Sequence, residues 1–204
     1  MSKVAIGART LLYPLPAVLV GADVDGKPNF STYAWCGIAG SKPPMLTVAF
    51  QRKRHTFKGV KQNGTYSVNI PSAELVRETD YCGLVSGRDT DKVADCKFSV
   101  FYGKLANAPL ISECPVNIEC SVVHVLDVGS HDLVVGRIEE VHATESCLTD
   151  GRPDAVKMDP FLWAMPPVNR YCRFGEPIGE AFRVGEQLKA KGKGKGKGKG
   201  KAEP

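Results

Sequence analysis

Residues 28–56 read PNFSTYAWCGIAGSKPPMLTVAFQRKRHT, with two apolar stretches, 30–39 and 45–50, on either side of a Lys-Pro-Pro corner. Both stretches are rich in aromatic and β-branched residues, which predicts strands. Proline restricts the residue before it to extended backbone, so the chain turns between the two strands without a helix. Hydroxyl side chains, Trp35 and the cations of residues 52–54 lie on or beside these strands. This combination suits a flat aromatic ligand that carries an anionic group.

The rest of the chain continues the strand-rich pattern. Further strands are predicted at residues 12–22, 65–70, 117–128 and 132–143, with short ones at 161–165, at 171–179 and within a mostly irregular stretch at 93–108. Asp25-Gly26 and residues 129–131 are hairpin turn signals. Helices are predicted at residues 54–62 and from residue 72 to the glycines at 83–87. Antiparallel connections favour a mainly β barrel with short flanking helices over a doubly wound sheet.

Charge is distributed unevenly along the 204 residues. The net charge is +5, but residues 189–204 contain seven Lys and one Glu, so residues 1–188 carry about −1. A nearly neutral body gives no support for a nucleic-acid groove. Alternating Lys and Gly predict a disordered tail at 189–204, which leaves residues 1–188 as one domain.

The seven cysteines are scattered, without a CxxC pair or the spacing of a zinc site. Their odd number, with no secretory signal before them, indicates reduced thiols in a cytoplasm. The apolar run near the N-terminus is short and interrupted by prolines, so no membrane span is predicted. We therefore expect a cytoplasmic protein without a metal site.

A flavin fits residues 28–56, because its ring needs apolar cover and hydrogen bonds while its phosphate needs cations and hydroxyls. No Gly-x-Gly-x-x-Gly follows a first strand, which argues against a Rossmann site. Each residue also has an ordinary interpretation in a core, a turn or a solvent-facing strand, so composition alone does not identify the ligand. The predicted contacts are Asn29, Ser31, Thr32, Ala34 and Trp35 for the ring, and Ser41, Lys42, Arg52, Lys53, Arg54, His55 and Thr56 for the phosphate, where a helix N-terminus adds N–H groups.

Four motifs are shared with a known family: residues 28–44, RKRHT at 52–56, YSVNIPS at 66–72 and DYCGLVSGRDTDK at 80–92. Through these motifs the chain resembles the flavin reductase-like, FMN-binding split-barrel family, most closely its flavoredoxin branch. The resemblance implies a six-stranded antiparallel Greek-key split barrel, a homodimer and non-covalently bound FMN, or FAD. The cofactor residues that it implies are Thr32, Tyr33, Ala34 and Trp35 at the ring, Ser41, Lys42, Arg54, His55 and Thr56 at the phosphate, and Asn69, Ser86, Gly87, Arg88, Asp89, Lys92 and His131 around them.

The resemblance further implies a flavin-dependent oxidoreductase, either an electron carrier or a reductase, with NAD(P)H or a ferredoxin-like protein as the electron donor. No catalytic side chain is expected, because the flavin itself carries the hydride chemistry. Two alternatives stay open: a reductase that supplies free reduced flavin to a monooxygenase, and a non-enzymatic module that holds flavin or haem. The sequence does not distinguish NADH from NADPH and assigns no role to Cys36.

Overall fold

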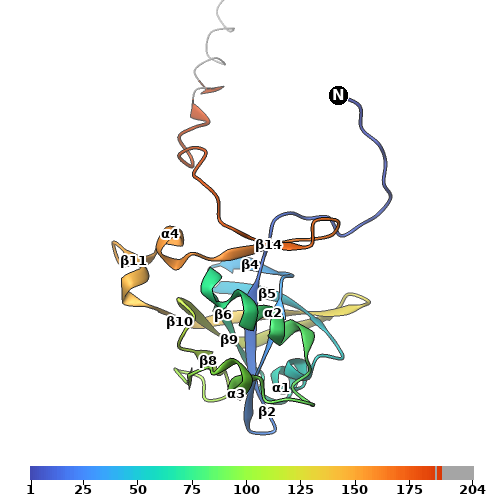
Figure 1. Ribbon diagram of the computed structural model, residues 1–204, viewed down its shortest axis with the longest axis vertical. Coiled ribbons are helices and arrows are strands. Elements are labelled where there is room, and N and C mark those ends of the chain that lie inside the picture. The colour runs from blue at the N-terminus through green and yellow to red at the C-terminus, as the bar shows by residue number, and fades with distance from the viewer. Residues whose placement is uncertain (187, 190–204) are drawn as a thin grey trace, which may run out of the picture. The chain divides into compact units, whose positions relative to one another are not determined.

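A computed structural model describes residues 1–186 and 188–189, and Figure 1 shows the course of its strands and helices. Residues 1–174 form one compact unit, and the chain from Gly175 on forms a second. The predicted disordered tail lies, from residue 190 on, outside the described residues. Among the helices of the described part, none has the length and apolar character needed to cross a membrane.

The first unit is mainly β, as the sequence predicts. Its strands are β1 (Leu15–Pro16), β2 (Val18–Val24), β3 (Lys27–Tyr33), β4 (Cys36–Ser41), β5 (Pro44–Gln51), β6 (Thr65–Ile70), β7 (Val100–Phe101), β8 (Leu110–Ile111), β9 (Val116–Asp127), β10 (His131–Ala143), β11 (Leu148–Thr149), β12 (Arg152–Pro153), β13 (Phe161–Ala164) and β14 (Arg170–Arg173). Its helices are α1 (His55–Asn63), α2 (Val76–Leu84), α3 (Lys92–Cys96) and α4 (Ala155–Met158), with 3-10 turns at Ala73–Leu75 and Glu145–Cys147.

Seven strands form one antiparallel sheet in the order β3-β2-β6-β9-β10-β5-β4. The predicted number of six strands is wrong, because residues 30–39 do not form a single strand. The chain leaves the sheet at Ala34 and Trp35, so β3 and β4 lie at opposite edges of the strand order. The main-chain N–H of Ala49 on β5 donates to the carbonyl of Trp35 at 2.9 Å, which holds this break against β5.

Strand β2 is buried along its whole length, because both of its faces are covered. Its alternate residues serve two apolar clusters, as the period of a strand requires. Val18, Val20 and Ala22 belong to the larger cluster, which also contains Phe57 of α1. Leu19 belongs to the smaller cluster, which includes side chains of β3, α2 and α3. The smaller cluster therefore seats α2 and α3 on the sheet.

Helix α1 packs against β2, and the two are neighbours in Figure 1. The close approach depends on Gly59, since a Cβ at this position would lie 2.3 Å from the carbonyl oxygen of Asp23. Gly64 ends the helix in the left-handed region at a φ of 65°. The short connection from β5 fixes the first turn of α1, with His55 and Thr56, beside the end of that strand.

Helix α3 was not expected, because the sequence predicts mostly irregular chain from residue 93. Five residues are too few to show an apolar period. The local signal is Asp91, whose side chain caps the helix by accepting hydrogen bonds from the main-chain N–H groups of Val93 and Ala94, both at 3.1 Å. The loop between α2 and α3 therefore carries the SGRD motif between two fixed helices.

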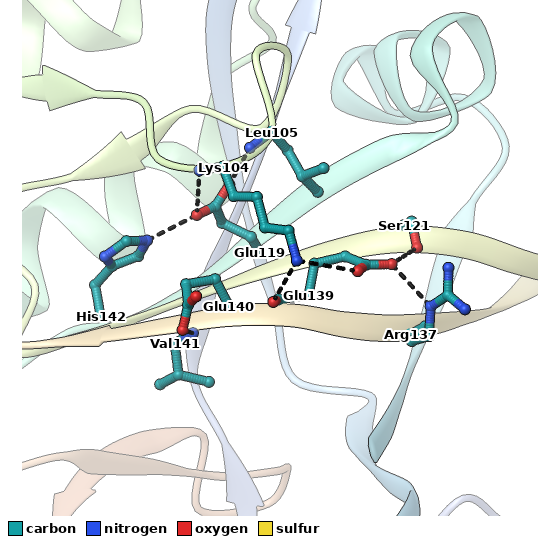
Figure 2. A network of polar contacts seen from close by, with 9 residues as sticks. All are labelled: Lys104, Leu105, Glu119, Ser121, Arg137, Glu139, Glu140, Val141 and His142. Carbon is teal, nitrogen blue, oxygen red and sulfur yellow. Dashed lines mark hydrogen bonds and ion pairs between the residues drawn. The ribbon is translucent and has the colours of Figure 1, made fainter. Parts of the chain in front are cut away.

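A buried carboxylate holds the chain after β7 against the sheet, as Figure 2 shows. Glu119 on β9 is fully buried and accepts hydrogen bonds from the main-chain N–H groups of Lys104 and Leu105 at 2.9 and 2.6 Å. Its Oε1 also lies 2.7 Å from Nε2 of His142 on β10. Burial by itself raises the pKa of Glu119, but these hydrogen bonds outweigh it and lower the pKa overall. The charge of Glu119 is thus fully accommodated within the chain.

Candidate functional site

A cavity of about 450 Å³ opens where the chain breaks between β3 and β4. Residues 32–35 form one part of its lining, and the end of β5, helix α2, the start of β10 and the β13–β14 hairpin form the rest. Its ring-bearing side chains include Trp35, His131, Trp163 and Tyr171. We call this cavity the aromatic compartment.

Aromatic and polar contacts organise the walls of this compartment. The rings of Trp35 and His131 lie 4.8 Å apart with 33° between their planes. On the β13–β14 hairpin, the hydroxyl of Tyr171 donates to Oδ1 of Asp80 at 2.9 Å, which ties the hairpin to α2. Burial, and then the hydrogen bond to Asp80, raise the pKa of Tyr171 to about 12, so this hydroxyl keeps its proton at neutral pH.

Strand β3 contributes differently on its two sides. Thr32 donates its hydroxyl hydrogen to the carbonyl of Thr79 on α2, and a Cβ at Gly83 of the same helix would lie 3.3 Å from the Cβ of Thr32. Tyr33 packs its ring on Phe50 with 4.8 Å between centroids, and burial raises its pKa above the ordinary range. Strand β3 therefore supplies a rigid edge to the aromatic compartment.

A second cavity of about 410 Å³ adjoins the first, since Gln51, Arg54, Gly83 and Leu84 line both. Lys53, the first turn of α1, the loop at residues 85–88 and Lys92 complete its lining, together with the buried Ser31. We call this cavity the cationic compartment. The two compartments together form one cleft, with an aromatic end and a cationic end.

The cations of the second compartment lack acidic partners. Arg54, Arg88 and Lys92 form no salt bridge with any residue that the structure describes. Each donates instead to main-chain carbonyls: Arg54 to Gly83 at 2.9 Å, and Arg88 to Lys53 at 3.1 Å. Carbonyl dipoles do not neutralise a full charge, so the compartment keeps a net positive charge.

Lys92 is the least exposed of these cations. Its side chain donates to the carbonyls of Phe30 and Cys82 at 2.9 and 2.8 Å, and the residue is 3% exposed. Burial lowers its pKa, because an ammonium group loses hydration without gaining a counter-charge. A bound anion would supply that counter-charge, so the residues present fit an anionic group.

The loop between α2 and α3 packs directly on β3 and α1. A Cβ at Gly87 would lie 1.8 Å from Oδ1 of Asn29 and 3.1 Å from Cδ2 of His55, so only glycine fits here. Nδ2 of Asn29 in turn donates to Oγ1 of Thr56 at 2.6 Å. Burial, followed by the charges of Arg88 and Lys58, lowers the pKa of His55, which favours the neutral imidazole. The loop, strand and helix thus meet at the cationic compartment.

A polar groove of about 640 Å³ lies beside the same loop, and Asn29, Asp89 and Lys92 contribute to its lining. Asp89 is exposed, and its main-chain N–H donates to the carbonyl of Ser86 at 3.0 Å. The predicted residues of this loop and Lys92 therefore divide between the cationic compartment and this groove, with Gly87, Arg88 and Lys92 lining both.

Four predicted contact residues lie elsewhere in the chain. Ser41 and Lys42 are exposed in the β4–β5 turn, at the opposite end of β5 from Gln51. Arg52 points to the β9–β10 hairpin, where it pairs with Asp127 at 2.5 Å and Asp132 at 2.8 Å.

Asn69 is fully buried and donates to the carbonyl of Leu19 at 3.0 Å while it accepts from the N–H of Ile111 at 3.0 Å. These positions follow from the hairpin geometry of β4–β5 and from a polar core contact, neither of which a linear motif reveals.

Several lining residues were not predicted from the sequence. Asp80, Gly83 and Leu84 belong to the DYCGL part of a quoted motif, and only their place on the inner side of α2 reveals their role. Trp163 and Asn169 come from the β13–β14 hairpin, more than a hundred residues from the opening segment. The sequence signal that could have indicated them is the pair of predicted short strands at 161–165 and 171–179, the first of which contains Trp163.

The sequence and the fold of the chain are similar to those of known proteins. The model of the Flavin reductase like domain matches residues 9–163. Flavoredoxin from Methanosarcina acetivorans is 41% identical, with a TM-score of 0.88 over 92% of this chain and 100% of that chain. Flavoredoxin of Desulfovibrio vulgaris (Miyazaki F) is 38% identical, with a TM-score of 0.83 over 90% of this chain and 100% of that chain.

Among curated proteins, the FMN reductase (NADH) RutF of Acinetobacter baylyi is 27% identical over 61% of this chain and 63% of its own length. The split-barrel class predicted from the sequence is confirmed by the structural matches. The chain belongs to the flavin reductase like domain family.

Proposed function

We propose that this chain binds FMN, with the isoalloxazine ring in the aromatic compartment and the phosphate in the cationic compartment. The observation that carries the proposal is the unbalanced charge of Arg54, Arg88 and Lys92 at one end of an aromatic cleft. The names of the similar proteins, flavoredoxin and FMN reductase, support the same ligand.

Each cation has a separate role in this proposal. Arg54 lies between the compartments and would orient the phosphate relative to the ring. Lys92 would give the phosphate a charge in a dry environment, where electrostatic attraction is strong. The first turn of α1 adds free main-chain N–H groups and a favourable dipole, while the neutral His55 can donate a hydrogen bond.

We further propose that the protein is an oxidoreductase, either an electron carrier or a reductase linked to NAD(P)H. Bound flavin supplies the hydride and electron chemistry. The chain's own part is to bind the ring, to orient it between Trp35 and the β13–β14 hairpin, and to limit the access of water. The printed activity of RutF supports a nicotinamide donor, and the name flavoredoxin supports a protein donor.

The spectrum of the purified protein tests the cofactor. We expect flavin absorbance that survives desalting, or its recovery on titration of the apoprotein with FMN. A protein that stays colourless in excess FMN refutes the proposal. Stopped-flow reduction by NADH, NADPH and reduced ferredoxin then identifies the donor, and fast turnover of added free flavin would favour a reductase that supplies a monooxygenase.

We also propose a homodimer. Strand β9, the turn after it and β10 expose apolar side chains at Val123, Val125, Leu126, Val128 and Val141, each more than 40% exposed. A second copy that packs against this hairpin would remove these side chains from water. Light scattering should give twice the chain mass, and Leu126→Glu should lower it toward one chain. A monomeric wild type at micromolar concentration would contradict the proposal.

A cytoplasmic location completes the proposed function. All seven cysteines are free thiols, and Cys172 is exposed. Free exposed thiols are typical of reducing compartments. Fractionation of the source cells with an antibody to the chain tests this location, and recovery from an extracellular fraction would contradict it.

A further inference from the structure

Two cysteines lie in contact beside the cationic compartment. Cys82 is fully buried on α2, and Cys96 is half-buried at the end of α3. Their Sγ atoms are 4.0 Å apart. A disulfide needs about 2.0 Å, so a combined movement of about 2 Å by two side chains would join them.

The helices that carry the two thiols are held together on both sides of the pair. The hydroxyl of Tyr81 donates to Oδ2 of Asp95 at 2.6 Å, one residue before each cysteine. Nζ of Lys92 donates to the carbonyl of Cys82 at 2.8 Å. The two thiols therefore stay close together as long as α2 and α3 are folded.

We propose that Cys82 and Cys96 form a redox-active dithiol that a peroxide converts to a disulfide. This site is separate from the proposed flavin chemistry and does not depend on it. Cys96 lines a surface cavity of about 520 Å³, together with Arg77, Glu78 and Asp95, and this cavity gives a small peroxide access to its sulfur. Cys82 is covered and serves as the second thiol.

The reaction balances with one peroxide. The sulfur of Cys96 loses its proton and attacks one oxygen of hydrogen peroxide, the O–O bond breaks, and the departing hydroxide takes up a proton to leave as water. The sulfur of Cys82 then attacks the sulfenic sulfur, the S–O bond breaks, and the proton of Cys82 leaves with the hydroxyl as a second water. The two thiols are oxidised and the peroxide is reduced. Burial raises the pKa of both thiols, so the thiolate fraction is small and the reaction is slow at neutral pH.

The disulfide would close a covalent ring around the loop at residues 83–95. That ring contains Gly87, Arg88 and Lys92, so oxidation would restrict the loop that lines the cationic compartment. A closed loop of this length restricts the unfolded chain and raises the melting temperature by about 5 to 10 °C. Oxidation would therefore stabilise the protein and slow the opening of this loop.

Peptide mapping of the full-length protein tests the proposal. After treatment with a small excess of hydrogen peroxide, quenching with catalase and alkylation, we expect a non-reduced peptide that links Cys82 to Cys96 and disappears with dithiothreitol. Cys172→Ser, which removes an exposed thiol elsewhere, should form the same link. Cys96→Ser and Cys96→Ala should abolish both the link and the gain in melting temperature.

Three results would overturn the proposal: no cross-linked peptide, a link from Cys82 to the buried Cys114 instead, or an equal gain in melting temperature in oxidised Cys96→Ser. The mapping needs no flavin. Its outcome is therefore independent of whether FMN binds, which the spectrum of the protein decides separately.

Discussion

Glu119 and Lys92 are both almost completely buried charges, at 0% and 3% exposure, but the chain treats them differently. Glu119 accepts two main-chain N–H groups and lies beside His142. Lys92 reaches only carbonyl oxygens and lines a cavity in which the other cations also lack acidic partners. The carboxylate of Glu119 has its hydrogen-bond partners within the fold. The ammonium group of Lys92 would gain an oppositely charged partner only from a bound anion.

We propose that this difference separates a structural charge from a ligand-binding one. Both groups lose hydration on burial, which disfavours their charged forms. Hydrogen bonds reverse that effect for Glu119, so its pKa is lowered, while the pKa of Lys92 is lowered because burial outweighs the opposing contributions of Cys82 and Cys96. Removing Glu119 should therefore damage the fold, and removing Lys92 should damage binding.

The largest effect is expected for Glu119→Ala. The change leaves the N–H groups of Lys104 and Leu105 without their acceptor and His142 without its partner. We expect a loss of about 3 to 5 kcal/mol in the free energy of unfolding, as for other broken buried pairs. Urea denaturation followed by circular dichroism measures this loss. The control is Glu140→Ala, an exposed acid on the same hairpin, which should change stability by less than about 0.5 kcal/mol.

Lys92→Met should have its main effect on the ligand. It removes the buried charge and keeps most of the side-chain volume, so FMN affinity should fall about 10- to 100-fold, as expected for a charged hydrogen bond. Riboflavin, which lacks the phosphate, should bind as before, and Lys61→Met on the exposed side of α1 should change neither affinity. Fluorescence titration measures the dissociation constants of FMN and riboflavin for both variants, and the wild-type values are the reference. Equal losses for FMN and riboflavin would show that Lys92 only supports the fold. Lys92 would then be a structural charge, as Glu119 is.

The two charges should also respond to pH in opposite ranges. The pKa of Glu119 is lower in the folded state, so its stabilising contribution is present above the ordinary value of 4.5 and is lost as the pH falls through the folded-state pKa. The pKa of Lys92 is also lowered, so the unfolded state binds its proton more tightly, and ligand-free stability should rise as the pH approaches 10.5. Melting temperatures from pH 3 to 10 test both slopes. Glu119→Gln should lose the acidic slope alone, and Lys92→Met the alkaline slope alone.

The smallest effect is expected for Lys42→Ala. Lys42 lies at the far end of β5 from the cleft of its own chain. If each cleft is formed by one chain alone, the ratio of FMN to riboflavin affinity should therefore not change. A selective loss of FMN affinity would mean that Lys42 reaches the cleft of another copy. That outcome would move one charge of the site to the proposed dimer partner.

The mainly β class, the β9–β10 hairpin and helix α1 could be predicted from the sequence, because alternating apolar residues, turn signals and glycines act locally. The two ends of the cleft were also predictable, since Trp35 and the residues of the RKRHT run lie within one segment, residues 28–56. The break at Ala34 and Trp35 was not, because both residues suit a strand and only the closing of the sheet forces the chain out there.

Contacts between distant segments were the other part that the sequence did not reveal. Arg52 looked like a phosphate ligand because it lies two residues before Arg54. The chain turns after β5, where the main-chain N–H of Arg54 donates to the carbonyl of Gln51 at 3.0 Å, and Arg52 meets Asp127 and Asp132. The contribution of Tyr171 depends on its hydrogen bond to Asp80, across 91 positions of the sequence. The spacing of residues along the chain does not predict a hydrogen bond between two residues so far apart.

The break between β3 and β4, at Ala34 and Trp35, interrupts the barrel at the cleft, and we call these two residues the seam. Two residues join the opposite edges of the sheet there, and the strands on either side are paired elsewhere. An insertion of one residue at the seam that moved β4 by one position along β5 would turn every side chain of β4 to the other face, because the alternation has a period of two. Replacing Trp35 without changing the length would leave that alternation intact. The seam therefore permits a change of side chain at the ring wall as long as its length stays fixed.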